Sequence, residues 1–122
     1  MRSIPRQSFS MYLFLPFFMF GIVIPESSGA AEFRCALRDV MVYSNRVHTQ
    51  CTTTTLDGST KIRYFAVPTT DAKLADRLLT IGTTTLVSGR RFIAGYTGGD
   101  TSGNSFGCLA KDCRKLVYFG ME

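Results

Sequence analysis

The chain has 122 residues, a formal net charge of +5 and four cysteines. Its basic residues are scattered or come in pairs such as Arg90-Arg91, not in a long run, so the charge does not favour a nucleic-acid partner over a solvated surface. The length predicts one small domain, and because the chain has no tryptophan its limited core should benefit from covalent cross-links.

Residues 1–31 have the layout of a secretory signal peptide. Two arginines precede an apolar run that ends at Pro25, and small residues follow up to Ala31. Cleavage after Ala30 or Ala31 would leave a mature domain of residues 32–122, secreted or periplasmic and with no membrane contact. The alternative is an uncleaved membrane anchor, because an apolar run of this length lies near the lower limit for a span.

The four cysteines all lie in the predicted mature domain: Cys35, Cys51, Cys108 and Cys113. An exported chain meets an oxidising compartment, where disulfides form. Four cysteines allow three pairings. We favour Cys35–Cys51, on two predicted neighbouring strands, and Cys108–Cys113, which closes a short loop. A zinc site is the alternative, but the chain lacks the CxxC spacing of such sites, so we predict disulfides and no metal.

The first part of the mature domain predicts three strands. Residues 33–43 alternate between apolar and polar, with a change of phase at Arg38 and Asp39 that predicts a β-bulge. A tight turn leads to a second strand over residues 46–55, and an Asp-Gly turn leads to a third over residues 61–67. These strands should form an antiparallel meander.

Residues 69–89 predict the single helix of the domain. Their apolar side chains recur at helical spacing in two adjacent rows, a broad stripe expected of a helix that lies on a sheet. Thr69 or Thr70 could cap its start, and Gly89 supplies the stop.

Two further strands, at residues 90–97 and 115–121, follow the helix and flank a glycine-rich loop over residues 98–107. The predicted order is therefore β-β-β-α-β-β with a bulged first strand. This order indicates an α+β, mainly β fold: an OB-fold-like five-stranded barrel, disulfide-linked, with the helix closing its open end.

Signals for catalysis or a cofactor are weak. His48 is the only histidine, has no carboxylate close to it in sequence, and is predicted to be an exposed strand residue. The thiols are assigned to disulfides, and the glycine-rich loop fits no phosphate-binding motif. Aromatic and basic residues are interleaved, which could suit stacking on single-stranded nucleic acid, but core packing explains the aromatics better. We therefore predict a non-enzyme with no cofactor and no nucleic-acid partner.

Four features of the chain resemble the B subunits of AB5-type bacterial toxins, in the subtilase-cytotoxin, typhoid-toxin and pertussis-toxin branches. They are the spacing of Cys35 and Cys51, the single helix, the stretch Arg91-Phe92-Ile93 and the late cysteine pair. The chain also resembles short secreted proteins of proteobacteria. The resemblance implies an exported, disulfide-bridged OB-fold that binds a host glycan and forms a homo-oligomer. Toxin subunits have a longer segment before the first cysteine, including part of the sugar site, so no sugar-site residue is carried over.

The expected function is an exported, non-catalytic binding domain, with a glycan as ligand. Tyrosine would offer a stacking face, and the other side chains would hydrogen-bond to hydroxyls. The alternative is a periplasmic structural or protein-interaction module. The candidate ligand-binding residues lie in the first turn, on the second strand and in the glycine-rich loop: Tyr43, Asn45, Arg46, His48, Asp100 and Asn104.

Overall fold

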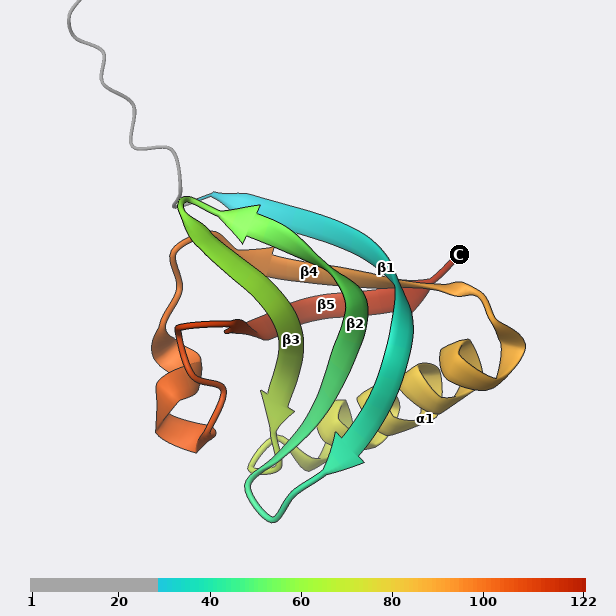
Figure 1. Ribbon diagram of the computed structural model, residues 1–122. Coiled ribbons are helices and arrows are strands. Elements are labelled where there is room, and N and C mark those ends of the chain that lie inside the picture. The colour runs from blue at the N-terminus through green and yellow to red at the C-terminus, as the bar shows by residue number, and fades with distance from the viewer. Residues whose placement is uncertain (1–28) are drawn as a thin grey trace, which may run out of the picture.

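The computed structural model describes residues 29–122, which form a five-stranded barrel with one α-helix (Figure 1). The predicted signal peptide lies outside the described residues, except for its last three positions. The elements are β1 (Ala30–Val42), β2 (Arg46–Asp57), β3 (Thr60–Pro68), α1 (Ala72–Ser88), β4 (Arg91–Thr97), the short 3-10 helix η1 (Ser102–Phe106) and β5 (Cys113–Met121).

The strands close into a barrel in the order β1-β2-β3-β5-β4, with β4 returning to β1. Neighbouring strands are antiparallel except β3 and β5, which run parallel. With α1 between β3 and β4, this topology confirms the predicted OB-fold-like architecture. β1 begins earlier than the predicted residue 33, because Ala30 and Ala31 pair with Thr97 and Tyr96 of β4.

The predicted bulge in β1 is confirmed, because the register with β2 shifts between Leu37 and Asp39. β1 pairs with β4 up to Ala36 and with β2 from Leu37 onward, so the bulge lies where the strand changes partner. Strict alternation from the buried Leu37 would point Asp39 into the core. The extra residue instead turns Val40 toward the core and Asp39 to the outer face.

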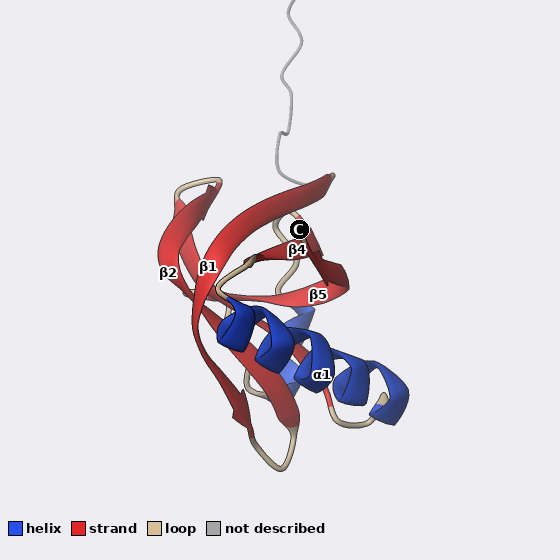
Figure 2. Cartoon of the chain, turned by 90° about the vertical axis from the view of Figure 1, so that its right-hand side faces the viewer, coloured by secondary structure: helices blue, strands red, loops and turns tan. Residues whose placement is uncertain are grey.

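Helix α1 lies across one end of the barrel (Figure 2) and buries Ala75, Leu78, Gly82 and Thr85. A Cβ atom at Gly82 would lie 3.0 Å from Cγ2 of Val40, so glycine allows the helix to approach β1 closely. In the second predicted apolar row, Ala75 and Gly82 belong to this buried contact, whereas Leu79 and Leu86 lie at its edge and are exposed.

The predicted capping residue of α1 is wrong. Asp71 is the N-cap, and its Oδ1 accepts the backbone N–H of Leu74 at 3.1 Å. Thr69 instead donates its hydroxyl to the carbonyl of Ser44, which joins the start of the helix to the β1–β2 turn. The predicted stop is confirmed, since Gly89 has φ +72° and its N–H donates to the Thr85 carbonyl.

The disulfides are those predicted, Cys35–Cys51 between β1 and β2 and Cys108–Cys113 at the start of β5. The first lies in the main core, and the second lies in a smaller cluster beneath η1. Within residues 29–122, no helix is both long enough and apolar enough to cross a membrane.

The glycine-rich segment after β4 is more ordered than the predicted loop, because it contains η1 and is held by a buried ion pair. Arg114 Nε lies 2.6 Å from Asp57 Oδ2, and both side chains are 4% exposed. Asp57 also accepts the backbone N–H of Gly99, and Arg114 Nη1 donates to the Ala110 carbonyl. These contacts join the end of β2, the loop and the start of β5, and so fix one wall of the cavity described next.

Candidate binding site

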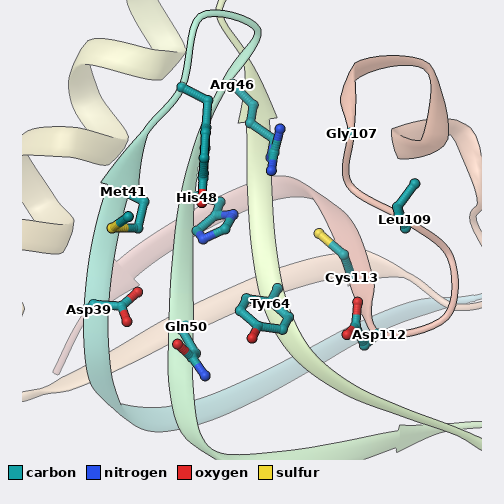
Figure 3. Close-up of a pocket in the computed structure, with 11 residues that line it drawn as sticks. Asp39, Met41, Arg46, His48, Gln50, Tyr64, Gly107, Leu109, Asp112 and Cys113 are labelled. Atoms are coloured by element: carbon teal, nitrogen blue, oxygen red, sulfur yellow. The ribbon is translucent and has the colours of Figure 1, made fainter.

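A cavity of about 330 Å³ opens on the outer face of β1, β2 and β3, and the segment from Gly107 to Cys113 closes it on one side (Figure 3). This is the face that OB-folds use to bind oligosaccharides and oligonucleotides, with the β1–β2 and β4–β5 loops at its rim. The volume is at the lower end of the range of about 300–1,000 Å³ for small-molecule sites. The cavity therefore suits one ligand unit of small size.

Strand pairing sets the floor of the cavity. Asp39 pairs with Gln50 and Met41 pairs with His48, so the four side chains project from β1 and β2 on the same face. The bulge in β1 is the physical reason that Asp39 belongs to this set. Tyr64 extends the floor onto β3, where it pairs with Gln50.

His48 lies between two tyrosine rings. Its ring centroid is 5.1 Å from that of Tyr43 and 5.3 Å from that of Tyr64. The predicted exposed position is therefore wrong, since only 8% of His48 is exposed. Alternation placed this side chain correctly outside the barrel, but the tyrosines that cover it come from the turn and from β3.

The surroundings of His48 favour its neutral form. Burial lowers the pKa of His48 below its ordinary value of 6.5, and the nearby Arg46 lowers it further, whereas Asp39 and Asp112 act in the opposite direction. At neutral pH the imidazole thus offers one donor and one acceptor and adds no positive charge to the cavity.

We expect the stability of the domain to fall as the pH drops below about 6.5. The pKa of His48 is lower in the folded chain than in the unfolded chain, so acid in this window protonates the unfolded state first and favours unfolding. The free energy of unfolding, measured with urea between about pH 7.5 and pH 5, should decrease by less than about 1.4 kcal/mol for each pH unit of acidification. This dependence on pH should be flatter in His48→Gln. An unchanged slope in this variant would contradict the assignment, because His48 is the only histidine.

Arg46 stands at the turn end of the cavity. Its guanidinium carbon lies 4.0 Å from the centroid of the Tyr43 ring, and Nη1 donates to Oδ1 of Asn45 at 2.9 Å. Gly107 makes room for it: this residue has φ +93°, and a Cβ atom there would lie 2.5 Å from Nη1. One face of Tyr43 is therefore already covered by Arg46, which leaves Tyr64 as the other ring for ligand contact.

Two polar atoms of the cavity residues are buried without a hydrogen-bond partner within residues 29–122: Oδ1 of Asp39 and Nε of Arg46. Buried polar groups are nearly always paired, because leaving one unpaired costs about 1–3 kcal/mol. One of these atoms is an acceptor and the other is a donor. Because both atoms are closed to solvent, a bound group that supplies a donor and an acceptor would satisfy them only when the two side chains turn toward it.

The structure brings three of the predicted ligand-binding residues, Tyr43, Arg46 and His48, to this cavity. Asn45 supports Arg46. The predicted loop residues are used within the loop, since Asp100 accepts the N–H of Ser102 and Asn104 accepts that of Ala110.

The cavity also contains residues that the sequence reasoning missed. Gln50 could have been predicted from the sequence, because it lies two residues from His48 and therefore on the same face of the strand. Asp39 lies in the predicted bulge, whose outward turn was a usable signal. Tyr64 and Asp112 had no such signal: they are brought together by the parallel pairing of β3 with β5, and the carbonyl of Asp112 accepts the N–H of Tyr64 at 3.1 Å.

Comparisons of the chain with protein-family models, with curated proteins and with solved structures found no match. Among residues 29–122, no three histidine, cysteine, aspartate or glutamate side chains are grouped so as to hold a metal ion. The fold and the cavity define the class to which the chain belongs, a small disulfide-linked barrel of OB-fold-like topology with a polar, aromatic-lined hollow on its outer face.

Proposed function

We propose that this chain is an exported, non-catalytic binding domain whose cavity holds one sugar residue of a glycan. The observation that carries the proposal is the pair of buried, unpartnered atoms, Asp39 Oδ1 and Arg46 Nε, in the lining of the cavity. A sugar offers hydroxyl groups that donate and accept at once, so it can satisfy both atoms. The two disulfides agree with passage into an oxidising compartment, secreted or periplasmic.

The remaining lining has the chemistry of a sugar site. Asp39 and Asp112 accept hydrogen bonds from hydroxyls, and Gln50 both donates and accepts. The ring of Tyr64 provides an amphipathic surface against which the C–H groups of a sugar can pack. The neutral His48 supports this ring and keeps water from one side of it. In a non-catalytic domain these groups position a ligand and leave its bonds intact.

The test is a glycan screen followed by calorimetry on the protein and two matched variants. Arg46→Met removes the Nε donor and should weaken binding about 10-fold to 100-fold, the range for a hydrogen bond to a charged group. Arg77→Met makes the same change at an exposed arginine of α1 outside the cavity and should leave the affinity unchanged. Bound glycans should be recovered intact.

Three results would contradict the proposal: no glycan bound by the wild-type protein, equal affinities in the two variants, or cleavage of the glycan. The last would indicate an enzyme. A folded wild-type protein, shown by a cooperative thermal transition, is the control for the first result.

A structural or protein-interaction module is the second candidate, and a separate groove favours it. This groove, of about 520 Å³, lies between α1 and β5 and is lined mainly by apolar side chains, including Ile81, Val117 and Phe119. Val117 is 57% exposed in the isolated chain. A mass measurement in solution separates the candidates, because the toxin-like proposal expects a homo-oligomer that binds sugar. A monomer without sugar binding would contradict that proposal.

A further inference from the structure

The cavity has two carboxylates that form no ion pair with another of residues 29–122. Asp39, on β1, and Asp112, just before β5, lie on opposite sides of the row of outward side chains from β2 and β3 (Figure 3). Both residues are half-buried, and neither forms an ion pair with another of residues 29–122. Elsewhere in the described chain, three acidic residues are paired with arginine: Glu32, Asp57 and Glu122.

This arrangement opposes the overall charge of the chain, which has 14 basic and 9 acidic residues. Two carboxylates face one guanidinium in the cavity, and His48 adds no charge because its pKa is lowered. Arg46 lies at the turn end, whereas Asp39 and Asp112 lie farther from the turn (Figure 3). The cavity therefore has a cationic end and a larger anionic end. Holding carboxylates away from water without a partner is unfavourable, so a cationic group on the ligand would stabilise the complex.

We infer that the sugar bound here is an amino sugar with a free, protonated amine. This inference rests on the proposed glycan-binding function and adds the chemical class of the sugar. The ammonium group has three donors and can form a charge-assisted hydrogen bond with the carboxylate of Asp39 or with that of Asp112. The ring of Tyr64, between the two carboxylates, provides a π face for the cation. Arg46 Nε and Gln50 then form hydrogen bonds with the sugar hydroxyls.

The experiment compares three trisaccharides that share a β-1,4-linked backbone: those of glucosamine, of N-acetylglucosamine and of glucose. They differ at one position of each ring, which carries an ammonium, an amide or a hydroxyl. Calorimetry at about pH 6 keeps the free amines of the glucosamine trisaccharide protonated. The glucosamine trisaccharide should bind about tenfold more tightly than the other two, which corresponds to about 1.4 kcal/mol.

The double variant Asp39→Asn/Asp112→Asn should abolish this preference and retain binding of the glucose trisaccharide. Asp76→Asn is the matched control, because Asp76 is an exposed carboxylate of α1, outside the cavity and without an ion pair among residues 29–122. It should keep the full preference. Trilysine tests for simple charge attraction and should bind more weakly than the glucosamine trisaccharide.

Equal affinities for the three trisaccharides would overturn the inference and leave the proposed glycan-binding function standing, whereas no binding of any trisaccharide or screened glycan would overturn both. A preference that survives in the double variant, or trilysine binding as tight as the sugar, would also overturn the inference. The comparison on the wild-type protein decides the question even where the double variant fails to fold.

Discussion

Replacing Arg114 with methionine should lower the free energy of unfolding by about 3–5 kcal/mol. The methionine fills much of the arginine volume, but it leaves Asp57 as a buried charge without its partner, which lies 2.6 Å away in the native protein. This loss of stability should exceed the loss caused by replacing any exposed arginine, since an exposed ion pair contributes about 0–1 kcal/mol. Urea unfolding, monitored by circular dichroism, measures the change.

The double variant Asp57→Asn/Arg114→Met separates the lost charge pair from lost packing. Asparagine keeps an oxygen that can accept the N–H of Gly99, and no charge remains buried. The double variant should therefore be more stable than Arg114→Met alone, by roughly half of the loss or more. A double variant no more stable than the single variant would show that packing, and not the unpaired carboxylate, dominates.

Removing the Cys35–Cys51 disulfide by replacing both cysteines with alanine should cost about 3 kcal/mol in the chain-entropy model, whereas removing Cys108–Cys113 should cost about 2 kcal/mol. The difference follows from the sequence separations, 16 residues for the first bridge and 5 for the second. The first pair also lies in the main core, where alanine would leave a cavity and add to the loss. Thermal and urea unfolding of the two double variants provide the comparison.

The two disulfides should differ in their effect on the cavity. Cys113 lines it, and Cys108 contacts Gly103 of η1, so loss of the second bridge loosens one wall. That variant should bind glycan more weakly while it loses less stability than the other. The reverse order, in which the Cys35→Ala/Cys51→Ala variant is the more stable of the two, would contradict the loop-length argument.

The cavity depends more on the direction in which a few side chains point than on the barrel as a whole. The bulge between Leu37 and Asp39 turns a carboxylate from the core to the outer face, and the parallel start of β5 brings Asp112 beside Tyr64. The buried pair of Asp57 and Arg114 holds the segment between β4 and β5 against the barrel. Stability and binding are therefore linked through this segment.

Local patterns in the sequence were sufficient for much of the fold. Alternation with period two, helical spacing and turn residues predicted five strands, one helix and the bulge in β1, because each pattern depends on neighbours a few residues apart. The disulfide pairing followed from the predicted hairpin and from the short distance between the last two cysteines. The helix cap was the exception: Asp71 competes with two threonines for the same role, and only the backbone geometry selects it.

The cavity depended on tertiary structure. Whether an outward side chain is exposed depends on what covers it, and His48 is covered by Tyr43 from a turn and by Tyr64 from another strand. Likewise, Asp100 and Asn104 have the composition of ligand-binding residues, but nearby backbone N–H groups occupy their oxygens. Sequence periodicity determined the framework, since it reflects local backbone geometry. The grouping of Asp39, Arg46 and Asp112 was decided only when distant segments packed together.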